Sequence, residues 1–553
     1  MINMGIDFGS TYTIASVMKN GEPTVVKSHN NSDHYPSVVC YDTEKNRYFF
    51  GNAARDMLGE PDVLAYRGFK MLLAQEPDEE ILKKRGYVGE NTPEYITELY
   101  LKHVIIDSLN KKKEDKVDLL VIGAPECWFQ SLQMVDARGA LRKICQNIVR
   151  DGWVNRFELR SEPTDAAAFC AWGYEQNTGN KFNGKIMVID YGGGTLDMAL
   201  VSVEHINDKL QIKPEILSGV GENHDQELGK AGIAYQEAVV RKAISDARGI
   251  PESEVPMDNS FAELVKDFED SLLSKSDYVD EIFEEYEARS DNDLKGEHFL
   301  TLKNNGEKIP VDFGQMKSVY KAVISPALEK VLNESTMDMD EDEQPYLALV
   351  GGFCNFYLVR QQIRNYFKSG ILNLQSKTLS FSEEDSERAI GYGACLLANH
   401  VLEVCHVAGF GIGMCVCYGG IEGRYFKRYA ISYGQEYVPG RIYFAKDLNG
   451  NVVGMMLTQA DKFLLNFFRK DEYGKPATPK AKIAKRLQSI TQTPSLSVIG
   501  FSIDEAERIT IHVFDYHRKA SETDYGTKIK CKKTIPLETF KESFNNILYS
   551  VGE

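Results

Sequence analysis

Short apolar runs alternate with longer amphipathic stretches over residues 1–400 of the chain. Three four-residue apolar runs occur at 119–122, 186–189 and 347–350. Runs this short, bounded by glycine turns, predict buried strands. Helical spacing of apolar positions predicts helices over residues 93–109, 132–149 and 316–332. This alternation of strand and helix signals predicts an α/β domain.

The pattern changes near Val407, after which six glycines fall between residues 409 and 423. Beyond them, period-two alternation separated by turns predicts an antiparallel β domain. The alternating stretches are residues 441–444, 452–457, 495–501 and 508–514. Residues 475–494 are basic and polar with several prolines and threonines, so we expect a loop or short helix there.

We therefore expect an α/β domain at residues 1–400, a linker at 401–408 and a β-rich domain at 409–553. Residues 261–286 carry regularly spaced apolar side chains among many carboxylates. Such a charge run predicts helices with a solvated acidic face, not a binding tail. Residues 338–343 predict an exposed acidic loop.

Composition narrows the classes of partner. The chain has 553 residues and a formal net charge of -17, and an acidic surface repels nucleic acid. No signal-peptide pattern opens the chain, and no apolar run is long enough to span a membrane. The ten cysteines lack metal-site spacing. We expect a cytoplasmic protein with reduced thiols and no nucleic-acid or membrane partner.

A candidate phosphate loop lies at residues 7–11, with the sequence Asp-Phe-Gly-Ser-Thr. Gly9 lets the backbone approach a phosphate closely, and the hydroxyls of Ser10 and Thr11 add donors. Asp7, at the strand end, can reach a magnesium ion through water, which is a contact that Mg²⁺ prefers. Alone, this sequence fits an ordinary turn equally well.

A second hairpin, residues 190–197, has the sequence Asp-Tyr-Gly-Gly-Gly-Thr-Leu-Asp and follows the run at 186–189. Three successive glycines cost chain entropy, and close passage of a phosphate chain accounts for them. Asp7 and Asp190 occupy matched strand ends, so both carboxylates would flank one metal–phosphate group. The two hairpins together predict two related α/β lobes that face one cleft.

A third glycine site, Gly351-Gly352-Phe353, follows the apolar run at 347–350. A glycine pair there lets a nucleoside lie flat against the backbone, although Gly-Gly alone is more often a turn. The three sites together predict a nucleotide whose phosphates lie between the two hairpins.

Residues 5–15, 186–199 and Gly351-Gly352, in this order, resemble the actin, sugar-kinase and heat-shock-protein-70 superfamily of ATPases. Within it, the chain most resembles the heat-shock protein 70 family. Residues 162–168, Glu-Pro-Thr-Asp-Ala-Ala-Ala, resemble its Glu-Pro-Thr-Ala-Ala-Ala connecting segment. Residues 386–394 resemble its second connecting helix, whose small residues let two helices cross at the cleft hinge. The resemblance implies a two-lobed, actin-like α/β ATPase domain over residues 1–400.

The resemblance also implies catalytic and metal-binding roles, with ATP or ADP and Mg²⁺ as cofactors. Asp7, Glu162 and Asp190 match carboxylates that hold magnesium through water or orient the attacking water. Lys70 and Thr195 match groups near the γ-phosphate, where a positive charge would stabilise the transferring phosphoryl group.

Nucleotide-binding roles follow from the same match. The phosphate-loop residues are Gly9, Ser10, Thr11, Tyr12, Gly192, Gly193, Gly194 and Thr195. The adenosine segment is Gly351, Gly352 and Phe353, and Gly221 is expected to keep a phosphate-side turn.

The chain departs from the family pattern around the base. Residues 353–357, Phe-Cys-Asn-Phe-Tyr, stand where the family has Ser-Thr-Arg-Ile-Pro, so Phe353 is expected to replace the arginine that packs on adenine. On the helix that supplies Glu, Lys and Ser to the base, Ser274 matches the serine and Asp270 stands where lysine is expected.

The C-terminal part resembles the family's β-sandwich peptide-binding domain over residues 411–439 and 509–513, and no helical lid follows before Glu553. This favours a slowly hydrolysing, chaperone-like ATPase that couples nucleotide state to binding of an extended peptide or unfolded protein, with a co-chaperone as a further partner. The alternative is an actin-like or kinase-like ATPase whose β domain binds one dedicated partner or supports a polymer.

Overall fold

Two compact units make up the protein, and each is described by itself. The computed structural model describes residues 1–74, 79–129, 137–220, 230–287, 291–304, 306–337, 339, 344–369, 378–379, 381–408, 411–417, 425–432, 434–447, 449–456, 463–466, 475–479, 496–504, 509–515, 531–535 and 544–545. The first unit comprises Met1–Phe129 and Val135–Val404, and the second comprises Cys405–Glu553. The boundary falls inside the stretch 401–408.

The first unit contains a sheet in the order β3-β2-β1-β8-β9, with the short β4 paired to β2. Its strands are β1 (Ile2–Phe8), β2 (Tyr12–Lys19), β3 (Glu22–Val25), β4 (Tyr35–Pro36), β8 (Val117–Ala124) and β9 (Val154–Ser161). β1 and β2 form an antiparallel hairpin, and β8 runs parallel to β1 on its other side. The first phosphate loop therefore joins β1 to β2.

A second sheet repeats this arrangement, in the order β15-β10-β11-β12-β16. Its strands are β10 (Gly184–Tyr191), β11 (Leu196–Ile206), β12 (Lys209–Val220), β15 (Tyr346–Val350) and β16 (Glu403–Val404). β10 and β11 form an antiparallel hairpin, and β15 runs parallel to β10. The prediction of two related α/β lobes, each with a glycine hairpin, is confirmed for the described residues.

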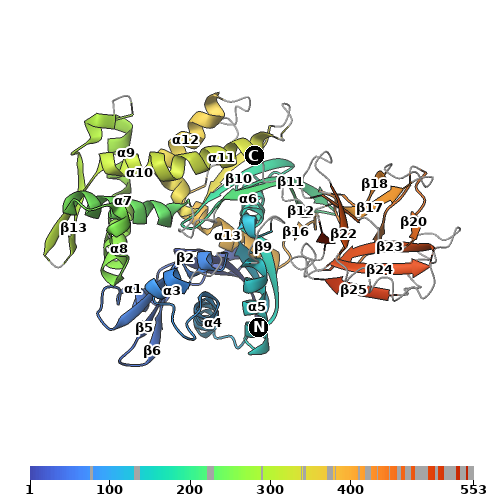
Figure 1. Ribbon diagram of the computed structural model, residues 1–553, viewed down its shortest axis with the longest axis horizontal. Coiled ribbons are helices and arrows are strands. Elements are labelled where there is room, and N and C mark those ends of the chain that lie inside the picture. The colour runs from blue at the N-terminus through green and yellow to red at the C-terminus, as the bar shows by residue number, and fades with distance from the viewer. Residues whose placement is uncertain are drawn as a thin grey trace. The chain divides into compact units, whose positions relative to one another are not determined.

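Two helices, α6 (Glu162–Thr178) and α13 (Glu383–Ala398), cross between these sheets, as Figure 1 shows at the centre of the unit. The crossing brings backbone against backbone, because a Cβ on Gly393 would collide with the carbonyl of Asp165. A Cβ on Gly5 of β1 would likewise collide with the backbone of Cys395 in α13. The small residues expected at this crossing are therefore required by close packing.

Smaller elements extend each half of the first unit. One group contains a three-stranded sheet, β6-β5-β7, and short helices. Its elements are β5 (Val38–Asp42), β6 (Arg47–Phe50), β7 (Val63–Arg67), α1 (Gly51–Arg55), α2 (Phe69–Leu72) and α3 (Glu79–Lys84). The other group is mainly helical, with the hairpin β13 (His298–Asn304) and β14 (Glu307–Asp312). Its helices include α7 (Gly232–Arg248), α8 (Asn259–Ser274), α9 (Ser276–Glu285) and α10 (Phe313–Val319).

The acidic stretch 261–286 forms α8 and α9, and its apolar positions enter the core as expected. Phe261, Leu264 and Phe268 are buried together with Val279 and Phe283. Most of the carboxylates between them face solvent. Residues 338–343, predicted as an acidic loop, lie almost wholly outside the described residues.

Other helices cover the outer faces. They are α4 (Pro93–Lys112), η1 (Glu126–Phe129), α5 (Ala137–Arg150), η2 (Glu252–Glu254), η3 (Asp291–Leu294), the π segment η4 (Tyr320–Ile324), α11 (Ser325–Met337), η5 (Gly352–Asn355) and α12 (Tyr357–Ser369). Thr92 caps α4 by accepting a hydrogen bond from the amide of Tyr95, 3.2 Å away, and Pro93 takes the first helical position. None of the helices in the described residues is long and apolar enough to cross a membrane.

The described part of the second unit consists of two antiparallel sheets and contains no helix. One has the order β18-β17-β21-β22-β26, formed by β17 (Gly411–Cys417), β18 (Tyr425–Ile431), β21 (Phe463–Asn466), β22 (Lys475–Pro479) and β26 (Phe544–Asn545). The other is formed by β19 (Tyr443–Phe444), β20 (Gly454–Met456), β23 (Leu496–Ile503), β24 (Ile509–Asp515) and β25 (Cys531–Ile535). Phe444, Val498 and Phe514 form a buried cluster.

The prediction of a loop or short helix at residues 475–494 is wrong for the first five of these residues. Lys475–Pro479 is strand β22, which pairs with β21 and β26. The segment contains two prolines and no apolar alternation, and proline is unusual in a strand that pairs on both sides, so the local pattern does not indicate a strand. Residues 480–494 lie outside the described residues.

Candidate functional site

The first phosphate loop turns tightly at Gly9, where a Cβ would collide with the carbonyl oxygen of Tyr12. Ser37 stabilises the loop through a hydrogen bond, because its hydroxyl donates to the Gly9 carbonyl at 2.7 Å. The Ser37 amide also donates to the Thr11 carbonyl at 2.8 Å. The loop conformation is therefore fixed by backbone contacts before any ligand binds.

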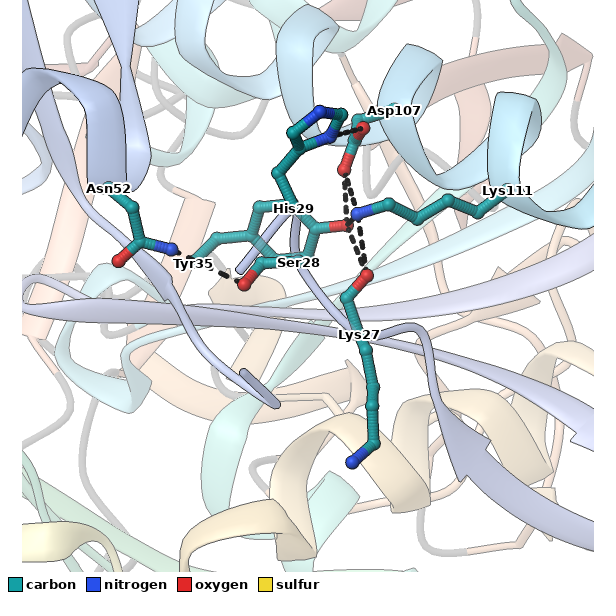
Figure 2. Close-up of polar contacts among 7 residues, drawn as sticks. All are labelled: Lys27, Ser28, His29, Tyr35, Asn52, Asp107 and Lys111. Carbon is teal, nitrogen blue, oxygen red and sulfur yellow. Dashed lines mark hydrogen bonds and ion pairs between the residues drawn. The ribbon is translucent and has the colours of Figure 1, made fainter. Parts of the chain in front are cut away.

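The segment that presents Ser37 is itself anchored to α4, as Figure 2 shows. Lys111 donates to the Lys27 carbonyl at 2.6 Å, and the Tyr35 hydroxyl donates to Asp107 at 2.8 Å. Lys111 also pairs with Asp107. This network ties residues 27–35 to the outer helix and so positions the strand β4 that precedes Ser37.

The second loop lies directly against the first. A Cβ on Gly193 would collide with the Thr11 hydroxyl, and one on Gly194 with the Ser10 hydroxyl. The amides of residues at the start of α7 dock on the same loop: Ile233 donates to the Gly193 carbonyl at 2.7 Å. Two of the three glycines are thus required by loop-to-loop packing, while Gly192 has open space where its Cβ would be.

Buried acidic groups gather beside the loops. Asp7 and Asp190 end the matched strands β1 and β10, and Glu162 opens α6. Carboxylate oxygens of Glu162, Asp190 and Asp197 all lie within 4.8 Å of one another. Asp197 faces Asp190 across the hairpin register. It belonged to the motif that predicted the second loop, but no local pattern distinguished it from an ordinary strand residue.

Lys70 supplies positive charge to this cluster. Its Nζ lies 2.6 Å from Glu162 Oε1, and both side chains are almost completely buried. Burial alone would lower the pKa of Lys70, but the charges of Glu162, Asp7 and Asp197 outweigh it and raise that pKa. The ammonium also lies 5.5 Å from the centre of the Phe8 ring.

The carboxyl groups in this cluster outnumber the single ammonium of Lys70, and the pKa values of Asp7 and Asp190 are raised. Burial raises the pKa of Asp7 to about 7, and the charge of Glu162 adds to this effect. Burial also raises the pKa of Asp190 well above its usual value, with Glu162, Asp197 and Asp7 adding to it. A divalent cation among these oxygens would relieve the repulsion, so the donor set fits Mg²⁺.

One cavity of about 430 Å³ joins the loops, the carboxylates and the glycine pair. Most of the residues predicted to bind nucleotide or metal line it: Asp7, Gly9, Ser10, Thr11, Tyr12, Lys70, Glu162, Asp190, Gly192, Gly193, Gly194, Thr195, Gly351, Gly352 and Phe353. Gly351 has φ +85, and a Cβ there would press on Asp190 and Tyr191, which explains the glycine. Gly221 lies outside the described residues.

Ser274 does not line the cavity. It is exposed at the end of α8, and its hydroxyl donates to the Ser271 carbonyl at 3.3 Å. The cavity wall instead receives Glu269, Leu272 and Leu273 from α8, and Ser276 from the start of α9. The structure therefore does not bring Ser274 to the cavity, and Ser276 lines the cavity instead.

Asp270, expected where the family has a lysine, pairs with a cation from the other half of the unit. Arg55 lies 2.7 Å from Asp270 and 3.3 Å from Glu269, and its guanidinium packs over the Tyr12 ring. Arg67 approaches Glu269 at 3.5 Å. These ion pairs connect the small sheet β6-β5-β7 region to α8 across the cavity.

Phe353 lines the cavity but is mostly committed to an aromatic cluster. It is buried, and its ring stacks on Phe356 with centroids 5.5 Å apart and contacts Tyr191 and Tyr235. Its expected role as the substitute for a base-stacking arginine stays a prediction.

Comparison with known proteins gives one family and several relatives. The family described as "Hsp70 protein" matches residues 3–403. The chain is 24% identical over 391 residues to chaperone protein DnaK of Carsonella ruddii, covering 66% of this chain and 59% of that protein. It is 29% identical over 224 residues to chaperone protein DnaK of Mycoplasmopsis synoviae, covering 40% and 32%. A match to the chloroplastic heat shock 70 kDa protein 7 of Arabidopsis thaliana is 29% identical over 239 residues, covering 40% and 30%. The chain thus spans between 30% and 59% of the length of these relatives.

Proposed function

The chain belongs to the Hsp70 family, and on that premise we propose that its first unit binds ATP with Mg²⁺ and hydrolyses the nucleotide slowly. The observation that carries the proposal is the direct contact of two glycine loops, one from each sheet, within a cavity that also holds buried carboxylates and Lys70. Such loops present backbone amides to phosphates, and the carboxylates suit a hydrated magnesium ion.

Asp7, Asp190 and Glu162 would hold Mg²⁺, with Asp197 close enough to Asp190 and Glu162 to share the task. When bound, the ion neutralises negative charge on the phosphates and on these carboxylates. The raised pKa values of Asp7 and Asp190 describe the protein without the ion, and binding would favour their ionised forms.

Lys70 and Thr195 are the candidate groups at the γ-phosphate. The buried ammonium would stabilise charge that develops on the transferring phosphoryl group. Glu162 accepts a hydrogen bond from Lys70, which holds its carboxyl group in place beside the loops and suits it to orient the attacking water. Gly193 and Gly194 would offer amides to the β- and γ-phosphates. The Gly192 amide donates to the Thr195 carbonyl at 3.1 Å, so Gly192 would contribute the open space left by its missing side chain.

For the second unit we propose binding of an extended peptide or unfolded protein on a β-sandwich built from its two sheets. Antiparallel sheets with exposed edges accept an extended segment as an added strand. A co-chaperone would be the further partner. The peptide experiment below distinguishes this proposal from the alternative, an actin-like or kinase-like ATPase whose β domain binds one dedicated partner.

Magnesium dependence is the first expected result. Isothermal titration of the full chain with ATP should give an affinity at least about tenfold weaker in EDTA than in magnesium, because the carboxylates and the phosphates would then repel each other. ADP should bind with the same dependence. Equal affinity with and without magnesium would contradict the proposed metal site, and no binding of either nucleotide would remove the proposed function.

Peptide binding by the second unit is the next expected result. An array of extended peptides probed with the full chain should retain apolar sequences, and adding Mg-ATP should change the amount bound. A scrambled charged set serves as the control. Absence of binding with and without ATP would favour the class in which the second unit serves one dedicated partner.

A further inference from the structure

Apolar side chains form a patch in the part of the cavity wall that comes from α8, α9 and the residue after η5, beside the polar Glu269, Ser276 and Asp280. Leu272, Leu273, Val279 and Phe356 line it. Leu273 is 58% exposed, which makes it a large aliphatic surface open to solvent at the cavity. An aromatic base packed on this surface would remove apolar area from water, and that removal favours binding.

The basic side chains that line the cavity already pair with carboxylates, which disfavours hydrogen bonding to the base or stacking on it. Among the described residues that line the cavity, the basic side chains are Lys70, Arg55 and His34. Each lies against a carboxylate: Glu162, Asp270 and Glu387, respectively. A guanidinium or ammonium already engaged in this way gives up an ion pair if it turns to the base, so apolar packing is the dominant contact available.

The polar side chains on this part of the wall accept hydrogen bonds or can rotate. Glu269 and Asp280 are acceptors that already pair with Arg55 and Arg360. Gln236 lines the cavity, and its Oε1 is buried without a hydrogen-bond partner in the described structure. An acceptor there suits an exocyclic amine, which both adenine and guanine carry, or a ribose hydroxyl, which every ribonucleotide carries. Asn355 and Ser276 each offer both a donor and an acceptor. None of these groups is a fixed donor that would distinguish the two purines.

We infer that the site binds purine nucleotides by packing the base on Leu273, with weak discrimination between ATP and GTP. The inference rests on the proposed function, since it concerns the base end of the same nucleotide site. Apolar pockets separate similar ligands poorly, whereas strong rejection requires a buried polar group that the wrong ligand leaves unpaired.

The direct experiment is titration of the full chain with Mg-ATP, Mg-GTP and magnesium tripolyphosphate. ATP and GTP should bind within about tenfold of each other, and tripolyphosphate should bind more weakly than both because it lacks the base. A preference of about a hundredfold or more for either purine would overturn the inference while leaving nucleotide binding intact. Failure of all three ligands to bind would overturn the proposed function as well.

The Leu273→Ala variant tests the contact itself. It should weaken ATP and GTP by a similar factor, roughly tenfold, and leave tripolyphosphate unchanged, since only the base loses apolar contact. Val88→Ala is the matched control, because Val88 is 45% exposed and does not line the cavity. Unchanged nucleotide affinity in Leu273→Ala, or weakening of tripolyphosphate to the same extent, would overturn the assignment of Leu273.

Discussion

Replacing Lys70 with alanine is expected to lower ATP turnover by about 100- to 1000-fold, the cost of removing one preorganised charge from a phosphoryl-transfer site. The measurement is single-turnover hydrolysis at saturating Mg-ATP. Lys45→Ala is the control, because Lys45 also pairs with a carboxylate, Asp42, at 2.6 Å but is largely exposed. Turnover within about threefold of the wild type would contradict the role of Lys70.

A second variant separates chemistry from folding. Removing Lys70 leaves the carboxylate of Glu162 buried without its partner, which costs about 3–5 kcal/mol of stability for a typical buried pair. The double variant Lys70→Ala with Glu162→Gln removes both charges and should recover most of that stability. It should not recover turnover. Recovery of both would mean that the single variant was merely unfolded.

Replacing Asp165 with alanine is expected to stabilise the protein at neutral pH, by about 1–3 kcal/mol, the typical cost of a buried polar group that makes no hydrogen bond. Asp165 is completely buried at the helix crossing, and neither carboxyl oxygen has a hydrogen-bond partner in the described structure. Alanine fits the site, because the next three residues of α6 are buried alanines. Thermal denaturation should show a melting temperature a few degrees higher, on the scale of about 1 kcal/mol for each few degrees.

The gain should depend on pH in a defined direction. Burial raises the native pKa of Asp165 well above its ordinary value, with Glu162 and Asp7 adding to the effect and Arg160 opposing it. A raised native pKa favours the folded state below the unfolded pKa, about 3.9, and that contribution is lost as pH rises toward the native pKa. The advantage of Asp165→Ala should therefore shrink toward pH 4.

Asp165→Asn is the matched variant, since it keeps the shape and polarity of the side chain but cannot ionise. Its melting temperature should lack the same pH dependence while gaining less at neutral pH, because the amide stays unpaired. Lower stability than the wild type in both variants at every pH would show that the carboxylate has a stabilising partner.

The phosphate and metal residues could be predicted because each follows a strand end. A buried apolar run, an aspartate and small residues are all local in sequence, and Asp7 and Asp190 meet because both hairpins present the same register. The reason for Gly193 and Gly194 was only partly predicted. Their tight fit against Thr11 and Ser10 depends on a loop more than a hundred residues away in sequence, which no local pattern contains.

The residues around the nucleotide base were predicted less well, because a shift of one or two positions along a helix changes which side chains face the cavity. Glu269, Leu272 and Leu273 follow the spacing of one face of α8 and line the cavity, while Ser276 lines it from the start of α9. A displacement of two residues turns a side chain by about 200°, so Ser274 points away from the site that its neighbours form. The ion pairs of Arg55 with this helix, likewise, join segments far apart in the chain.

The glycine contacts at the crossing of α6 and α13 limit how these elements can move relative to each other. At Gly393 and at Gly5 the main chains of neighbouring elements touch, with no side chain between them to bend or change rotamer. Such a junction resists closer approach and sliding, because both would press rigid backbone on rigid backbone, but it allows one element to turn on the other. We therefore expect relative motion of the two sheets to be a rotation about the point where the two helices cross.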